Sequence, residues 1–190
     1  RCSIDFTGGL RPSGARHFRI LQAADVTSES TSYRIRKARE DDMPWIALTI
    51  ASMIMSPLGL STPNFLVAEA EEETIGKVRL GFAQLRSLDS QECGPFLLAS
   101  LFVEPEARGQ GVATGLVKEL LARRERCSTP RSPVYALTLK NKLGFFERLQ
   151  FRELGETEDL PDALALEAQL GRWIAPLAAG EPLIVLRNDG

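Results

Sequence analysis

The sequence predicts a mixed α/β (α+β) domain over residues 33–190, preceded by a leader over residues 1–32. Segments with strand-like alternation and segments with helical periodicity follow one another along the chain. One segment, Phe96 to Val103, is apolar along nearly its whole length, which is typical of a central strand covered on both faces. The length also favours one domain, because 190 residues bury one core and hardly two.

The first half of the domain predicts three strands and one helix. Tyr33 to Lys37 alternates like a strand. Three consecutive acids and Pro44 then supply the cap and first turn of a helix that runs through Met53. The apolar run Phe65 to Glu69 and the alternating segment Ile75 to Leu88 predict a hairpin around an acidic turn.

The second half begins with the apolar strand and continues with an amphipathic helix. Val112, Leu116 and Leu120 share one face of this helix, whereas Lys118, Glu119, Arg123 and Arg124 are expected on its polar face. The remaining expected elements are a strand over Val134 to Leu139, a helix over Leu143 to Leu149, a strand from Phe151 to Leu154, a helix over Asp162 to Trp173 and a strand over Leu183 to Arg187.

Composition excludes several classes of protein. The chain is 44% hydrophobic and 25% charged with a net charge of −2, which argues against a protein that coats nucleic acid. Prolines interrupt the longest apolar stretch, Met43 to Phe65, so we expect no membrane span. Three scattered cysteines and the single His17 cannot supply a structural zinc site, and they leave little room for a histidine-based catalytic triad. We therefore expect no metal, and a reducing compartment.

The leader differs in composition from the rest of the chain. It carries four arginines before Gln22 against one acid, Asp5, and a run of serine and threonine follows. This composition is typical of an organelle transit peptide. The alternative is an ordinary tail on a cytoplasmic protein.

A glycine-rich turn joins the apolar strand to the amphipathic helix. Gly109 and Gly111 remove side chains where a ligand must approach the backbone, and the first turn of a helix offers free amides and a positive dipole end. Arg108 adds a forked cation. Together they predict a cradle for a phosphate or diphosphate. The alternative is a tight turn that needs glycine for steric reasons alone.

Two common nucleotide motifs fit this turn poorly. The chain lacks the GxxxxGK[ST] string of a Walker loop. The dinucleotide pattern GxGxxG ends on Thr114 in place of the third glycine, and Gly109 comes several residues after the strand. A nucleotide-binding domain stays a weaker alternative.

The segment Leu101 to Thr114, LFVEPEARGQGVAT, resembles the acetyl-CoA motif [RQ]-x-x-G-x-[GA] of the GNAT family of N-acetyltransferases. Some thirty residues later, Phe145 to Phe151, FFERLQF, is similar to the F-Y-E-x-x-G-F segment of that family. The resemblance extends over roughly Tyr33 to Leu154. The leader and the layout also resemble plastid members of the family.

The resemblance implies a GNAT-like mixed central sheet whose two central strands splay apart, flanked by helices. Acetyl-CoA would lie in the gap, its pantetheine arm on the first strand and its diphosphate on the glycine-rich turn, while an amine attacks the thioester directly. The residues that it implies for acetyl-CoA binding are Leu101, Phe102, Val103, Arg108, Gly109, Gln110, Gly111, Val112, Ala113, Thr114, Asn141 and Phe146.

Two positions depart from the family pattern. Phe146 stands where many relatives carry a tyrosine that protonates the leaving thiolate, and phenylalanine cannot donate a proton. Gln150 replaces the glycine before the final Phe151, which we expect to matter only to the turn. The expected catalytic candidates are Glu104 and Glu69 as bases, and Ser100 as a relay.

The sequence thus predicts an acetyl-CoA-dependent N-acetyltransferase acting on a primary amine. The acceptor stays open, with protein N-terminal α-amines and lysines among the choices. The main alternative is a catalytically weak acyl-CoA-binding regulatory module, which the missing tyrosine and the uncertain base suggest. We expect neither nucleic acid nor a membrane as a partner, and the sequence does not predict an oligomeric state.

Overall fold

The structure, a computed structural model, describes residues 32–53, 55–72, 76–89, 94–124, 132–155 and 158–190. The predicted leader, apart from Ser32, therefore lies outside the described residues. Within these ranges, no helix has the length and apolar character needed to cross a membrane. The same ranges hold no cluster of three or more His, Cys, Asp or Glu side chains suited to a metal ion.

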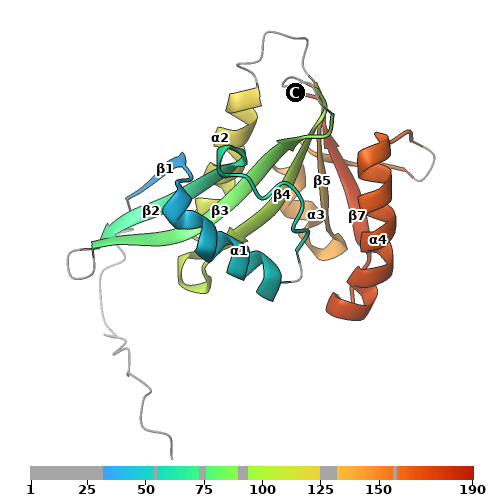
Figure 1. Cartoon of the computed structure of the whole chain (residues 1–190). Coiled ribbons are helices and arrows are strands. Elements are labelled where there is room, and N and C mark those ends of the chain that lie inside the picture. Colours follow the sequence, from blue (N-terminus) through green and yellow to red (C-terminus); the bar gives the residue numbers. More distant parts are fainter. Residues whose placement is uncertain (1–31, 54, 73–75, 90–93, 125–131, 156–157) are drawn as a thin grey trace, which may run out of the picture.

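A mixed sheet of seven strands forms the centre of the molecule, with the order β1-β2-β3-β4-β5-β7-β6 (Figure 1). All neighbouring strands are antiparallel except β4 and β5, which are parallel. The strands are β1 (Tyr33–Lys37), β2 (Phe65–Glu72), β3 (Gly76–Ser87), β4 (Phe96–Val103), β5 (Val134–Leu139), β6 (Arg152–Glu153) and β7 (Leu183–Asn188).

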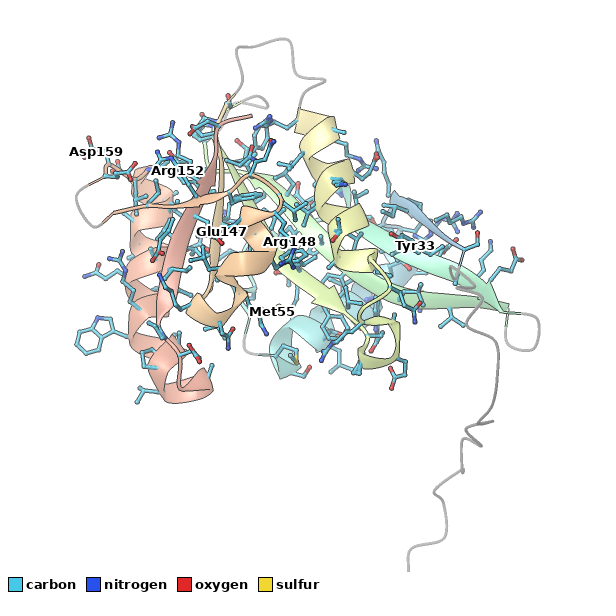
Figure 2. The ribbon with its side chains drawn as sticks, turned by 180° about the vertical axis from the view of Figure 1, so that it is seen from behind. Tyr33, Met55, Glu147, Arg148, Arg152 and Asp159 are labelled. Carbon is cyan, nitrogen blue, oxygen red and sulfur yellow. The ribbon has the colours of Figure 1, made fainter. Side chains whose placement is uncertain are left out.

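Helices cover both faces of this sheet. Helices α1 (Met43–Ser52) and α4 (Asp162–Ala179) lie on one face, in front in Figure 1, and α2 (Val112–Arg124) and α3 (Leu143–Glu147) lie on the other, seen in Figure 2. We call these the α1/α4 face and the α2/α3 face. The described 3-10 helices are η1 (Glu40–Asp42), η2 (Thr62–Asn64), η3 (Pro105–Ala107) and η4 (Lys140–Lys142).

The core is divided between the two faces because successive strand residues point to opposite sides. On the α2/α3 face, Leu116 and Leu120 of α2 pack on the sheet together with Phe146 of α3. On the α1/α4 face, α1 and α4 fill separate clusters. Ile46 of α1 belongs to the first of these, and Leu164 of α4 to the second.

The predicted fold class is confirmed, and most element bounds agree. Strands β4 and β5 have the predicted bounds. The prediction was wrong at the end of α4, which continues past Trp173 to Ala179 and includes Pro176. A proline late in a helix loses only one amide donor, and Gly180, in the left-handed conformation with φ of 67°, ends the helix instead.

Candidate functional site

Strands β4 and β5 start as partners and then part. They pair only at Phe96–Val134, Leu97–Tyr135 and Leu98–Ala136, so the second halves of both strands have no register partner in each other. Parallel strands share their carboxyl ends, so the gap opens where β4 runs into the glycine-rich turn. The predicted splay of the central strands is therefore confirmed.

A β-bulge lies in β4 at the point where the strands part. Phe82 pairs with Phe102 and Gln84 with Ala99, so one residue of β3 faces two residues of β4. Ser100, one of these two, has a positive φ of 48°, which is uncommon for any residue other than glycine. Its buried hydroxyl oxygen has no hydrogen-bond partner among the residues that the structure describes.

The glycine-rich turn leads into α2 with its amides free. Gly109 and Gly111 have φ values of 79° and 80°, a left-handed conformation that explains glycine at both positions. The Gly115 amide donates to the Gly111 carbonyl at 2.9 Å, which is the first hydrogen bond of the helix. The amides of residues 112–114 therefore precede any intrahelical partner and add to the positive end of the dipole.

Tyr33 holds this turn from the neighbouring end of β1 (Figure 2). Its hydroxyl donates to the Gly111 carbonyl at 3.2 Å. A Cβ atom at Gly115 would lie 2.6 Å from that hydroxyl, so glycine is needed there to admit the ring. Sequence reasoning missed Tyr33, although a glycine inside a helix, which costs about 1 kcal/mol relative to alanine, was a usable signal.

Arg108 and Gln110 stabilise the glycine-rich turn through side-chain hydrogen bonds to nearby backbone carbonyls. The Arg108 Nε donates to the Val103 carbonyl at 3.1 Å, and the Gln110 side-chain amide donates to the Glu106 carbonyl at 3.0 Å. Both side chains remain exposed. The Arg108 guanidinium thus lies beside the end of β4, at the edge of the amide cradle.

Two further polar side chains come from the elements after β5. Asn141 is exposed on η4, directly after β5, and so follows the strand on the far side of the gap from β4. Arg148, in the turn after α3, lies between α3 and α2 in Figure 2. No local sequence pattern identifies Arg148, because nothing near it in the chain separates it from other surface arginines.

Phe146 packs inside the α2/α3 face. It is 5% exposed and makes edge-to-face contacts with Phe145 and Phe151 at centroid distances of 5.0 Å and 5.5 Å. The turn that follows contains Gln150 with φ of 65°, the conformation that glycine adopts most easily. The departure from the family pattern at Gln150 therefore concerns the turn, as predicted.

Glu69 is engaged in a buried ion-pair network on the α1/α4 face. It is 3% exposed and accepts hydrogen bonds from Arg34 and from the Arg36 Nε, the latter at 2.6 Å. Burial alone would raise the pKa of Glu69, but Arg36 and Arg34 lower it below its usual value. This pairing makes the Glu69 carboxylate a weaker proton acceptor. Strand β3 also separates Glu69 from the gap beside β4.

Asp42 is the second buried acid of this network. Its carboxylate accepts from Arg36 at 2.6 Å, from Arg79 at 2.8 Å and from the Arg39 amide at 2.8 Å. Burial would raise the pKa of Asp42, but these hydrogen bonds hold it well below its usual value. Asp42 thus fixes η1 and the start of α1 to the sheet.

Glu104 follows β4 directly, and its position differs from that of Glu69. Its amide donates to the Leu80 carbonyl of β3 at 2.8 Å, and its side chain is half-buried. Continuing the alternation of β4, in which Phe102 faces the α1 cluster, places Glu104 toward the α1/α4 face. It therefore lies at the end of the strand that borders the gap.

The loop after α1 is tied down over β3 on the same face. Gln84, which is fully buried, donates to the carbonyls of Leu58 and Gly59 at 3.2 Å and 2.6 Å. Arg86 forms an ion pair with Glu167 of α4. These contacts join the α1 loop, the sheet and α4 on the side of the gap opposite α2.

Comparisons with known proteins agree with this arrangement. A family model described as an acetyltransferase (GNAT) domain matches residues 61–153. No curated protein matches the chain.

Solved structures share the fold at low sequence identity. N-acetylglutamate synthase from Neisseria gonorrhoeae, complexed with coenzyme A and L-arginine, has a TM-score of 0.59 at 21% identity. This match covers 83% of the chain but 34% of the synthase, so the chain spans about a third of that protein. Rv2747 from Mycobacterium tuberculosis, in complex with CoA and NLQ, has a TM-score of 0.57 at 20% identity over 80% of the chain and 97% of its own. Arabidopsis thaliana Naa50, in complex with the bisubstrate analogue CoA-Ac-MVNAL, has a TM-score of 0.56 at 11% identity over 84% and 99%.

Proposed function

From the match of residues 61–153 to a GNAT acetyltransferase domain model, we propose that the chain is an acetyl-CoA-dependent N-acetyltransferase. It transfers an acetyl group directly to a primary amine. The observation that carries the proposal is the gap between β4 and β5, which opens at the strand end beside the free amides of α2.

The donor half of the site matches the parts of acetyl-CoA. The diphosphate lies against the amides from Gly109 to Thr114, where the helix dipole favours negative charge. The pantetheine arm lies along Leu101 to Val103, the part of β4 without a partner in β5, and pairs with it as an added strand. Arg108 and Arg148 supply cations near the phosphates, and Asn141 contacts the arm near the thioester.

The reaction needs a neutral amine and a leaving thiolate. The amine nitrogen attacks the thioester carbonyl carbon, the C–S bond breaks, and coenzyme A leaves as a thiolate. Glu104 is the base that we propose for the ammonium proton, and Ser100 is the proposed relay. The paired Glu69 is not part of this route. A thiol with a pKa of about 8.5 is a tolerable leaving group, so Phe146 weakens catalysis without preventing it.

The acceptor that we propose is a protein N-terminal α-amine or a lysine side chain. An α-amine has a pKa near 8 and loses its proton far more easily than lysine at about 10.4, which suits a site with few bases. The peptide-like analogue bound to Naa50 supports a peptide acceptor. The competing proposal, an acyl-CoA-binding module without turnover, rests on Phe146.

Acetylation of a peptide panel, read by mass spectrometry, tests the activity and identifies the acceptor together. We expect transfer from acetyl-CoA to at least one amine. Binding of acetyl-CoA without transfer to any amine would support the module instead.

A glycine pair tests the cradle itself. Gly111→Trp is expected to abolish the thermal stabilisation by acetyl-CoA, because the side chain fills the space at the free amides. Gly76→Trp is the control, since Gly76 has the same φ of 80° in the β2–β3 hairpin, far from the gap. Stabilisation by ATP or NAD alone, or unchanged binding in Gly111→Trp, would contradict the proposal.

We also propose that the protein works in a plastid. The arginine- and serine-bearing composition of residues 1–32 supports this. Residues 1–32 fused to a fluorescent protein should direct it to plastids in plant cells. A fusion with its arginines replaced by glutamate should stay in the cytosol, and cytosolic fluorescence of the unchanged fusion would contradict the proposal.

A further inference from the structure

Helix α4 has two apolar faces on opposite sides, and only one packs on the sheet. Leu164 and Ala168 are buried against β4, β5 and β7, and Gly171 allows close approach because a Cβ there would lie 2.8 Å from Leu183. Large apolar side chains that are half or more exposed form the opposite face, which we call the outer seam: Leu166, Leu170, Trp173, Ile174 and Leu177.

The outer seam is large for a surface patch. Trp173 is 73% exposed and Leu177 is 89% exposed. Because free side chains of this size each present on the order of 150 Å², the five together present on the order of 500 Å² of apolar surface. This apolar area is near the upper range for the largest apolar patch of a monomer. It is more than half of the roughly 800 Å² that each partner buries in an interface of standard size.

The spacing of the seam is that of paired helices. Leu166, Leu170, Trp173 and Leu177 follow one another at intervals of four, three and four residues, which is the repeat of a helix–helix interface. An antiparallel pair of α4 helices with its twofold axis midway between Leu170 and Trp173 sets Leu166 opposite Leu177 and Leu170 opposite Trp173. The seam is therefore complementary to itself.

The charges on α4 favour a second copy of this helix over a membrane surface as the partner of the outer seam. Between Ala163 and Ala179 the charged residues are Glu167, which is paired with Arg86, and Arg172. A helix that lies on a membrane carries lysines and arginines along its polar face. The outer seam has one such flanking cation, Arg172.

We propose that α4 is the dimerisation helix of this protein and pairs antiparallel with α4 of a second copy. The inference is independent of the proposed enzymatic function, since it requires neither acetyl-CoA nor turnover. Sedimentation velocity of the full chain over a wide range of concentrations should show a species of twice the monomer mass.

Complementary charges test the register. Leu170→Glu and Trp173→Lys should each give a monomer, because each homodimer then buries a charge against an apolar side chain twice. Mixing the two variants should restore a dimer, since residue 170 of one copy meets residue 173 of the other. The control Leu48→Glu changes an exposed leucine of α1, outside the seam, and should leave the dimer intact.

Four results would overturn the proposal. A monomer at every concentration would exclude the pairing, and dimers unaffected by Leu170→Glu and Trp173→Lys would place the interface elsewhere. Co-sedimentation with phospholipid vesicles that is lost in Trp173→Lys would assign the seam to a membrane. Failure of the mixed variants to dimerise would exclude the antiparallel register.

Discussion

The two faces of the sheet are built by different means. On the α2/α3 face, the candidate donor site consists mainly of backbone: free amides, left-handed glycines and an unpaired stretch of β4. On the α1/α4 face, charged side chains from distant parts of the chain form ion pairs, as in the pairs of the buried Asp42 with Arg79 and of the partly buried Arg86 with Glu167. A backbone site is encoded in one contiguous segment, whereas a side-chain network exists only once the chain has folded.

This difference has a consequence for tolerance to mutation. Loss of Asp42 removes the buried counter-charge that Arg36 and Arg79 share, so stability suffers. Changes near the glycine-rich turn are expected to alter ligand affinity more than stability. Five predictions test this division.

Asp42→Ala should have the largest effect. It leaves Arg36 and Arg79 without their shared buried counter-charge, and breaking such a pair costs about 3–5 kcal/mol in unfolding free energy. Chemical denaturation measures this loss. The matched control is Asp41→Ala, since the Asp41 side chain is exposed and its loss is expected within about 0.5 kcal/mol. Equal losses would show that the network does not hold the α1/α4 face.

Acid should act on the same network. The pKa values of Asp42 and Glu69 are lowered in the folded protein, so their stabilisation is complete above the unfolded pKa of about 4 and is lost as the pH falls. We expect the melting temperature to drop below about pH 4. The drop should be smaller in Asp42→Asn, and an equal drop in that variant would contradict the assignment.

Tyr33→Phe should weaken acetyl-CoA binding while changing stability little. Loss of the hydrogen bond to the Gly111 carbonyl is worth about 1 kcal/mol, or about a fivefold change in dissociation constant. Titration calorimetry measures the affinity, and kcat at saturating acetyl-CoA should be unchanged.

Gly115→Ala should mimic that loss, because its Cβ displaces the tyrosine hydroxyl. In the Tyr33→Phe background the same change should cost less affinity. Additive effects would show that Tyr33 and Gly115 act separately on the turn.

Gln150→Gly should have the smallest effect, and a favourable one. A left-handed conformation costs a residue with a Cβ about 1 kcal/mol, and glycine relieves it. Thermal denaturation should show a gain of up to about 1 kcal/mol. Gln169→Gly, inside α4, is the opposing control and should lose about 1 kcal/mol. A loss at both positions would contradict the strain at Gln150.

Sequence alone predicted the parts of the molecule that depend on local patterns. Strands β4 and β5 and the glycine-rich turn are recognisable because apolar runs and left-handed glycines depend on neighbouring residues. Sequence patterns did not predict features that depend on residues far apart in the chain. Arg124 was expected on the polar face of α2, yet it is 4% exposed and donates to the Asn188 side chain of β7 at 3.3 Å.

The candidate site also combines features that the sequence predicted with features that it did not. The spacing around Gly111 indicated an anion cradle, but no local pattern showed that Glu69 is surrounded by arginines of another strand. Periodicity placed Leu170 and Trp173 in a helix without revealing which side of that helix meets the sheet. Charge pairing and solvent exposure are properties of the assembled chain, so motifs do not predict them.

The bulge in β4 comes from a single extra residue and lies next to the point where β4 and β5 part. Before Ser100, Leu98 contributes to the cluster under α2, and after it Leu101 and Val103 do so, which shifts the inward positions from even to odd numbers. Without Ser100 the remaining residues of β4 would alternate regularly, so Leu101 and Val103 would still face α2 while the bulge would be lost. Ser100 is thus an extra residue in β4, and it interrupts the regular pairing with β3 just after the pairing with β5 ends.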